Sequence, residues 1–429
     1  MPPAMSELGP SPLSAGDDHL SVAAARAAIH AAIRPITDIE SVPLARALGR
    51  VLAAEVISPI DVPAHDNSAM DGFAFDGALL AAGAALAMPV LATVFAGQPW
   101  QGAMSAGSCL RIMTGAVMPP GVNTVVPHEL CHVENERLLL QPGVVKPGEN
   151  LRRRGEDLAV GKAALPRGRR LRPSDMGLIA SLGIQAVHVY RRLRVALFST
   201  GDELRNPGEP LPPGCIYDSN RASLLGALQR LGVEVIDLGL VRDDPAALEA
   251  TLNSAVAQAD AILTSGGVSM GDADHTRAVL ARLGQVAFWK VAMRPGRPFA
   301  FGPLRHSGPN EHVAWMFALP GNPVAALVTF YAFAREALLV MAGANDEGLV
   351  TLQARTATPI RKRPGRTEFQ RAIVSRTSDG TWDVRSTGAQ GAGILRSLSE
   401  ANALLVLTHE QGSVAAGEMV EVWLFDGLV

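Results

Sequence analysis

The sequence is poor in cysteine, aromatic residues and net charge, and each shortage excludes a class of protein. Three cysteines occur in 429 residues, at positions 109, 131 and 215, and none belongs to a CxxC pair. This spacing excludes a disulfide framework and a structural zinc site made from paired cysteines. Aromatic residues make up 5% and the formal net charge is −3, so the chain carries no basic signature of nucleic-acid binding.

Long apolar runs are missing as well. The closest candidate, residues 324–342, is interrupted by Arg335 and Glu336, whereas a membrane span needs about 18 uninterrupted apolar residues. Residues 1–17 have no basic stretch followed by an apolar one, so we expect a disordered tail rather than a secretory signal. With the unpaired cysteines, these absences predict a cytoplasmic protein without a membrane partner.

Glycine and proline are abundant, at 42 and 30 residues, and apolar residues make up 48% of the chain. This composition is that of a globular protein with many turns. At about 150 residues per domain, the length allows about three domains.

The pattern of apolar residues changes several times along the chain. Helical spacing at 20–33 precedes short strands at 42–57, and a Gly- and Pro-broken β pattern with one helix at 77–87 follows. A helix is expected at 173–182, strands alternate with helices from 191, and short alternating strands from 350 indicate a small β-barrel or sandwich. The predicted domains are a tail (1–17), a discontinuous N-terminal domain (18–57 and 151–190), a β-rich insert (58–150), a doubly wound α/β domain (191–345) and a C-terminal β domain (346–429).

The most informative segment is DAILTSGGVSMGDADHTRAVL at 260–280, in which an apolar strand meets a glycine-rich turn and a helix. Backbone N–H groups of such a turn suit a phosphate or another oxyanion. Asp272 and Asp274 would repel that anion unless a divalent cation such as Mg²⁺ lay between them. The alternative is an ordinary turn with a solvated acidic helix N-terminus.

Other segments repeat this strand-to-turn pattern. VALFSTGDEL at 195–204 and FALPGNPVAAL at 317–327 are strands that run into polar turns, and Asp243 and Asp244 follow a third strand. In a parallel sheet the carboxyl ends of the strands share one edge, where ligands bind. We therefore predict one ligand site built from these turns.

Several motifs resemble those of the molybdopterin molybdenumtransferase family, which is related to the C-terminal domain of gephyrin. They are DNSAMDGFA from Asp66, RIMTGAVMPPG from Arg111, LRRRGEDL from Leu151, STGDEL from Ser199, TSGGVSMGDADHTR from Thr264, KVAMRPGRPFAFG from Lys290 and LPGNPVAAL from Leu319. The resemblance covers residues 20–429. It implies an elongated N-terminal domain, a molybdopterin-binding α/β domain and a C-terminal β-barrel. It also implies that adenylylated molybdopterin and molybdate yield molybdenum cofactor and AMP with Mg²⁺.

The resemblance also implies roles for individual residues. Asp243 and Asp274 are the metal carboxylates with Glu203 close by, although helix capping is an alternative for Asp243 and Glu203. Lys290 is the cation for phosphate or molybdate. The chemistry of molybdate, a small dianion, adds Arg294, Arg297 and Ser397 as candidates, with a basic surface patch as the alternative for the two arginines. Arg294 replaces the family's usual lysine. The substrate-binding set is Thr200, Gly201, Asp202, Ser265, Gly266, Gly267, Ser269, Gly271, Pro320, Pro323 and Ser397.

In the first half of the chain, the resemblance assigns catalytic roles to Asp66, Thr114 and Asp157. Turn chemistry alone would explain most of the DNSAMDG segment. The family interpretation makes Asp66 face the active site of a second copy, so it implies a homodimer with composite sites. It also expects residues 152–154, all arginine, to lie against acidic groups.

Two other functions use related folds. One is a non-catalytic molybdopterin-binding scaffold of the gephyrin type, against which the full acidic and basic set argues. The other is molybdopterin adenylyltransferase, which shares the α/β unit but needs neither the β insert nor the C-terminal β domain. In the catalytic interpretation, the adenylyltransferase and molybdoenzyme-specific acceptors are the possible partners.

Overall fold

The computed structural model describes residues 20–267, 279–305, 312–345 and 348–425. These form two compact units, which we describe separately. Unit 1 contains the chain up to residue 40, residues 49–51 and everything from 189 onward, and unit 2 contains residues 41–48 and 52–188. The finer division into five predicted segments stays a prediction.

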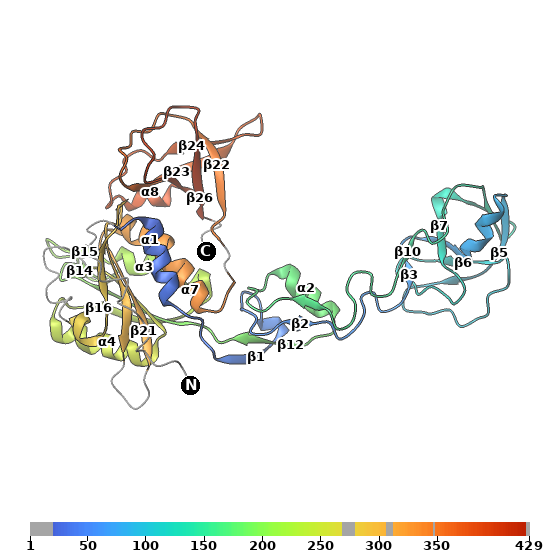
Figure 1. Ribbon diagram of the computed structural model, residues 1–429, viewed down its shortest axis with the longest axis horizontal. Coiled ribbons are helices and arrows are strands. Elements are labelled where there is room, and N and C mark those ends of the chain that lie inside the picture. The colour runs from blue at the N-terminus through green and yellow to red at the C-terminus, as the bar shows by residue number, and fades with distance from the viewer. Residues whose placement is uncertain (1–19, 268–278, 306–311, 346–347, 426–429) are drawn as a thin grey trace. The chain divides into compact units, whose positions relative to one another are not determined.

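Unit 1 is built on a six-stranded sheet in the order β16-β13-β17-β21-β20-β18 (Figure 1). Strands β16, β13, β17 and β21 pair in parallel with one another, which confirms the doubly wound fold. Strands β20 and β18 are antiparallel to theirs, so the sheet is mixed rather than wholly parallel as expected. The bounds are β13 (Arg194–Thr200), β16 (Glu234–Val241), β17 (Ala261–Ser265), β18 (Ala287–Lys290), β20 (Pro298–Arg305) and β21 (Val313–Leu319).

Helices cover both faces of this sheet. Leu248 and Leu252 of α4 (Pro245–Gln258) pack with Ala196 and Phe198 of β13 in one buried cluster. Helix α3 (Ser219–Leu231) also contacts β13 and packs against α6. Strand β13 lies inside the sheet and is buried from residue 195 to residue 200, which explains why residues 195–198 are all apolar.

A 19-residue helix, Pro323–Met341, combines α6 (Pro323–Thr329), a π-helical turn η5 (Phe330–Ala334) and α7 (Arg335–Met341). Its length and apolar composition alone would allow it to cross a membrane, but 78% of its most apolar window is buried inside the protein. The helix is therefore a core helix of the protein. Helix α1 (Val22–Ala32) is confirmed near its predicted bounds, and it contacts the π-helical turn η5.

The C-terminal strands close into a barrel, which decides between the two predicted β architectures. Their order is β23-β24-β22-β26-β25, and β25 pairs again with β23. A short strand, β19 (Met293–Arg294), joins β23 from the α/β region. The bounds are β22 (Thr351–Thr356), β23 (Thr367–Arg376), β24 (Trp382–Ser386), α8 (Leu395–Ser399), β25 (Ala403–Leu407) and β26 (Met419–Leu424).

Unit 2 contains a six-stranded sheet in the order β7-β4-β6-β5-β9-β8. The helix predicted at 77–87 is wrong in extent: a 3-10 helix covers Gly77–Ala82, Gly83 ends it with φ of +62°, and the alternating residues from Leu86 join the sheet. The strands are β4 (Gly72–Phe75), β5 (Leu86–Val94), β6 (Cys109–Ile112), β7 (Thr124–Pro127), β8 (His132–Glu134) and β9 (Arg137–Leu140), with the 3-10 helix η4 (His128–Leu130) after β7.

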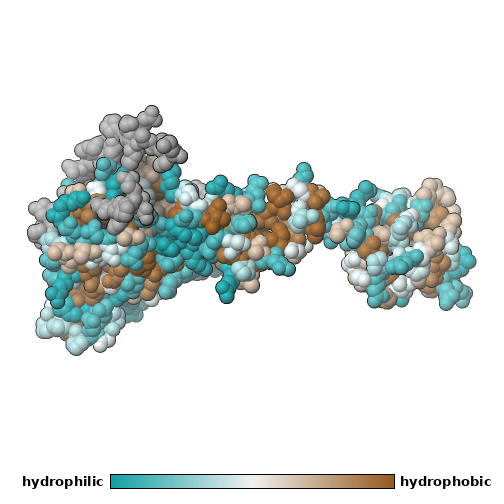
Figure 2. All heavy atoms as spheres, turned by 90° about the horizontal axis from the view of Figure 1, so that it is seen from below, coloured by the Kyte–Doolittle hydropathy of each residue, from teal (hydrophilic) through white to brown (hydrophobic). Residues whose placement is uncertain are grey.

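Smaller pieces complete the chain. Helix α2 (Pro173–Ser181) is confirmed, and it begins with a proline as the sequence indicates. Figure 2 shows apolar surface on the part of the chain around α2. The exposed large apolar residues of unit 2 include Leu48, Ile57 and Ile60. The remaining pieces are β1 (Ile39–Pro43) paired with β12 (Ala186–Tyr190), the 3-10 helix η2 (Leu44–Arg46), β2 (Val56–Ile57) paired with β11 (Ala163–Leu165), and β3 (Asn67–Ser68) paired with β10 (Leu151–Arg152).

Candidate functional site

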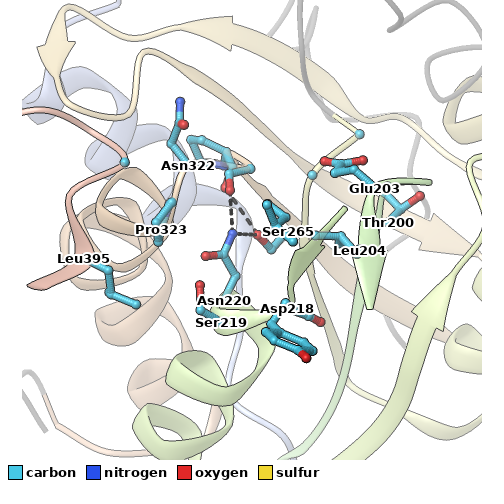
Figure 3. A pocket seen from close by; sticks show the side chains of 18 of the residues that line it. Thr200, Glu203, Leu204, Asp218, Ser219, Asn220, Ser265, Asn322, Pro323 and Leu395 are labelled. Atoms are coloured by element: carbon cyan, nitrogen blue, oxygen red, sulfur yellow. Dashed lines mark hydrogen bonds between the residues drawn. The ribbon is translucent and has the colours of Figure 1, made fainter. Parts of the chain in front are cut away.

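A pocket of unit 1 lies at the carboxyl ends of the parallel strands and has a volume of about 850 Å³ (Figure 3). From β13 the chain passes to β16 on one side and then to β17 on the other, so the strand order reverses there. Ligands of doubly wound proteins bind at such a switch point. Nine predicted residues line the pocket: Thr200, Gly201, Glu203, Asp243, Ser265, Gly266, Gly267, Pro320 and Pro323.

Three predicted residues, Ser269, Gly271 and Asp274, lie outside the described residues. Five others are described but are not among the lining residues: Asp202, Lys290, Arg294, Arg297 and Ser397. The structure therefore gathers the strand-end turns into one pocket, as predicted, and places the expected cations beside it rather than in its wall.

Two glycines of the pocket leave little room for a Cβ atom, one beside a backbone segment and the other beside a side chain. A Cβ atom on Gly266, whose φ is +96°, would lie 2.4 Å from the carbonyl oxygen of Thr200. A Cβ atom on Gly201 would lie 2.6 Å from Oε2 of Glu203. At Gly266 both the backbone oxygen and φ require glycine, whereas at Gly201 the Glu203 carboxylate could move aside and the φ of +154° is what favours glycine.

Asn220 joins the ends of β17 and β21, and the sequence interpretation missed it. Its Nδ2 atom donates to Ser265 Oγ at 2.6 Å and to the carbonyl oxygen of Gly321 at 2.6 Å. Ser265 Oγ donates in turn to the carbonyl of Pro320 at 3.3 Å, and the Gly266 N–H donates to Leu319 O at 3.2 Å. The available signal was the YDSN segment at 217–220, which opens a helix.

Two helix N-termini open at this pocket. Asp218 caps α3 by accepting from the Arg221 N–H at 3.0 Å, and Ser219 and Asn220 begin the helix. Asn322 and Pro323 begin the long helix Pro323–Met341. Helix N-termini carry partial positive charge and unpaired N–H groups, so the pocket suits an anionic ligand.

In Figure 3, Thr200 and Glu203 lie on one side of Ser265 and Asn220, and Pro323 and Leu395 lie on the other. The capping interpretation of Asp243 is wrong, because Asp244 caps α4 by accepting from the Ala247 N–H at 2.9 Å. It is also wrong for Glu203, which precedes the short strand β14 (Leu204–Arg205) and not a helix. Both carboxylates instead line the pocket.

Side-chain oxygen atoms that can bind a metal ion line the side of the pocket at Thr200, Glu203 and Asp243. Thr200 Oγ1 is buried and has no hydrogen-bond partner within the described parts of the chain. The same parts contain no cluster of three His, Cys, Asp or Glu side chains arranged to hold a metal ion. Two carboxylates and a hydroxyl suit a hard cation such as Mg²⁺, which takes oxygen ligands and keeps several waters.

The predicted cations lie near the barrel side of the pocket. Lys290 ends β18 opposite Pro298, which lines the pocket, and Arg294 is exposed in β19. Ser397 is buried: its Oγ accepts from Arg371 Nε at 3.0 Å and donates to Ile394 O at 2.7 Å. Its hydroxyl donor is therefore engaged with the protein.

Arg371 is a wholly buried cation that the sequence interpretation missed, because nothing in the strand pattern of 367–376 distinguishes it. Its guanidinium donates to the carbonyl oxygens of Ala389 at 3.2 Å and Gly391 at 3.0 Å. Burial lowers the pKa of Arg371, and the charge of Arg294 lowers it further. Arg371 therefore holds the segment 389–397, in which Gly393 and Leu395 form part of the pocket wall.

The remaining predicted residues lie in unit 2. Asp66 is exposed, and its Oδ1 accepts from the Arg154 N–H at 2.7 Å. Arg154 Nε donates to Asp61 Oδ2 at 2.5 Å, which confirms that one of the three arginines lies against an acidic group. The Val160 N–H and Arg154 hold the pKa of Asp61 below its usual value.

Thr114 is exposed in the same unit and contacts an aspartate that was not assigned a role. Its Oγ1 and N–H donate to Asp71 Oδ1 at 2.6 and 2.7 Å, and these bonds lower the pKa of Asp71. Backbone bonds from Gly115 to Ser68 and from Met118 to Asp66 bring the segments of Thr114 and Asp66 together. Asp157 is also exposed, and its N–H donates to Val62 O at 3.0 Å.

Three family models match successive parts of this chain. They are the MoeA N-terminal region (domain I and II) at 20–183, a probable molybdopterin binding domain at 196–339 and the MoeA C-terminal region (domain IV) at 353–425. The middle match contains β13, β17 and both helix N-termini of the pocket. The chain as a whole is thus a multidomain protein of the MoeA fold.

Relatives match along nearly the whole chain. A molybdopterin molybdenumtransferase of Haemophilus influenzae is 41% identical over 92% of this chain and 95% of its own length. One of Nostoc sp. is 36% identical over 90% of this chain and 88% of its own length. The crystal structure of a molybdopterin biosynthesis moeA protein from Pyrococcus horikoshii OT3 has a TM-score of 0.80 and 28% identity, covering 95% of this chain and all of that one. The chain belongs to the molybdopterin molybdenumtransferase family.

Proposed function

We propose that the pocket at the strand ends binds adenylylated molybdopterin, and that AMP is released there with the help of Mg²⁺. The family places the chain in molybdenum cofactor biosynthesis, as a transferase that inserts molybdate into molybdopterin. What we propose beyond this is that the molybdopterin is adenylylated and that a metal ion takes part.

The observation that carries the proposal is that groups suited to an anion and carboxylate side chains line the same pocket. Two helix N-termini open into the pocket, while Glu203 and Asp243 line it. A phosphate beside two carboxylates would be repelled unless a cation separated them. We assign Glu203 and Asp243 to the metal, with Asp274 as a third carboxylate. Bound there, Mg²⁺ would neutralise charge that develops on the phosphate oxygens.

The protein groups have separate tasks in this scheme. The N–H groups at the starts of α3 and of the helix from Pro323 bind and orient the phosphates. Lys290 and Arg294 provide positive charge for molybdate beside the pocket, close to the wall that Arg371 and Ser397 hold. Arg294 keeps the charge of the family's usual lysine, and its planar guanidinium can contact two oxygens of an oxyanion.

We further propose that the working unit is a cytoplasmic homodimer in which Asp66, Thr114 and Asp157 complete the site of the second copy. These three residues are exposed in unit 2, where a protein partner could reach them. Leu48, Ile57 and Ile60 expose apolar surface on the same unit. Contiguous apolar surface often marks an interface between proteins. A molybdopterin adenylyltransferase and molybdoenzyme-specific acceptors are the proposed partners on either side of the reaction.

The test compares two neighbouring aspartates. Asp243→Asn removes the proposed metal carboxylate, whereas Asp244→Asn removes the adjacent charge and keeps a residue that can still cap α4. AMP release from adenylylated molybdopterin with molybdate and Mg²⁺ should fall about 10²-fold or more in the first variant, as when a transition-state stabiliser is lost. The Asp244→Asn variant should stay within about twofold of the wild type. Equal rates in both variants, or AMP release that persists in excess EDTA, would reject the metal site.

A further inference from the structure

Tyr217 is an exposed aromatic residue at the wall of the pocket. Its side chain is 43% exposed, and neighbouring Ile216 is 56% exposed. Both lie in β15 (Ile216–Tyr217) and line the pocket, and Tyr217 is the one aromatic residue among the lining residues that the structure describes. None of the strand-end motifs accounts for it, and the proposed metal and phosphate contacts do not use it.

The position of Tyr217 is determined by hydrogen bonds at both ends of the residue. Its hydroxyl donates to the carbonyl oxygen of Glu209 at 2.9 Å. Strand β15 pairs in parallel with β14, through the Ile216 N–H to Glu203 O at 2.8 Å and the Asp218 N–H to Arg205 O at 2.9 Å. Tyr217 therefore lies in a strand that is hydrogen-bonded to the segment of Glu203, and it directly precedes Asp218, the N-cap of α3.

Further polar contacts hold the loop that accepts the Tyr217 hydroxyl. The Glu209 carboxylate accepts from the N–H and the Nδ2 of Asn206 at 2.9 and 2.8 Å, and these bonds lower the pKa of Glu209. Asn206 Oδ1 accepts from Arg221 Nη2 at 2.7 Å, and Arg221 also pairs with Asp218. A ring held in this way loses little conformational freedom when a ligand packs on it.

An exposed ring with its polar atom already satisfied has an apolar face left for contact with a ligand. Aromatic rings stack on planar heterocycles, and every base offers a π face, so such a contact recognises the ring system and not its substituents. We propose that Tyr217 is the stacking platform for a planar bicyclic heterocycle, purine or pterin, of the ligand whose phosphates lie at the helix N-termini. This inference rests on the proposed function and adds a subsite to it.

The test measures binding of three phosphate ligands, AMP, neopterin monophosphate and ribose 5-phosphate, to the full chain with Mg²⁺ by calorimetry. Ribose 5-phosphate has the phosphate without the ring. Tyr217→Leu should weaken binding of at least one ring-bearing ligand about fivefold or more, the loss expected when a stacked aromatic is removed. Tyr217→Phe, which keeps the ring, should retain affinity within about twofold, and Leu211→Ala controls for loss of an exposed apolar residue of the loop that precedes β15.

Each outcome has one meaning. A loss for AMP alone identifies the purine, a loss for neopterin monophosphate alone identifies the pterin, and a loss for both shows that the platform accepts either ring. Unchanged affinity of Tyr217→Leu for both ring-bearing ligands overturns the inference and leaves the proposed function standing. An equal loss for ribose 5-phosphate also overturns it, because Tyr217 would then act on the fold of the pocket. A wild-type protein that binds none of the three ligands rejects the proposed function itself.

Discussion

The glycine at position 266 provides a sharp test of the pocket geometry. Its φ of +96° lies where residues with a side chain are strained, at a cost of about 1–3 kcal/mol. A Cβ atom there would also approach the Thr200 carbonyl oxygen to 2.4 Å, and this oxygen belongs to the backbone of β13. Overpacking against a rigid neighbour costs another 1–3 kcal/mol. We therefore expect Gly266→Ala to lower the free energy of unfolding by about 4 kcal/mol.

The neighbouring glycine of the same pocket provides the control. A Cβ atom on Gly321 would meet its nearest atom, the Cα of Gly266, at 3.8 Å, which is an ordinary contact. Gly321→Ala should change the free energy of unfolding by at most about 0.5 kcal/mol. Urea unfolding followed by circular dichroism gives both values, and ribose 5-phosphate binding shows whether the pocket survives. If the urea midpoint of Gly266→Ala equals that of Gly321→Ala, the close approach of the two strand ends is wrong.

Three other predictions concern separate features. Asn220→Ala removes the donor to Ser265 and Gly321, so it should lower the free energy of unfolding in urea by about 1–3 kcal/mol and weaken AMP binding. Ser219→Ala should do neither. Equal stability of the two variants would contradict the bridging role of Asn220. Burial raises the pKa of Cys109 to about 12, so at pH 8 roughly one thiol in 10⁴ is ionised. Iodoacetamide followed by peptide mass spectrometry should therefore label native Cys109 far more slowly than Cys215, and equal rates would refute its burial. For the homodimer, mixing equal amounts of inactive Asp66→Ala and Asp243→Ala chains should restore about a quarter of wild-type activity, because half of the dimers then contain one intact site; no recovery after demonstrated subunit exchange would exclude shared sites.

Much of the fold follows from local pattern. Alternating strands with helices between them predict the doubly wound unit, because burial on both faces requires apolar strands and amphipathic crossover helices. The period of two from residue 350 onward predicts short strands, and five strands there form the barrel. The helix predicted at 77–87 shows the limit of such patterns, since its last residues belong to a strand that the neighbouring strands stabilise.

The sequence by itself determined which turns carry the site chemistry: strand ends rich in glycine, hydroxyl and carboxylate groups, at Thr200, Glu203, Asp243 and Ser265. These features are local, because a turn needs its own residues to adopt its conformation and to present its N–H groups. Only the tertiary structure decided which groups meet across the chain. It placed Asn220 between two strand ends and Arg371 behind Ser397, and it assigned the helix cap to Asp244 rather than Asp243. The physical reason is that hydrogen bonds between distant segments depend on the order of the strands and on how the chain crosses between them. A local pattern of residues does not determine either of these.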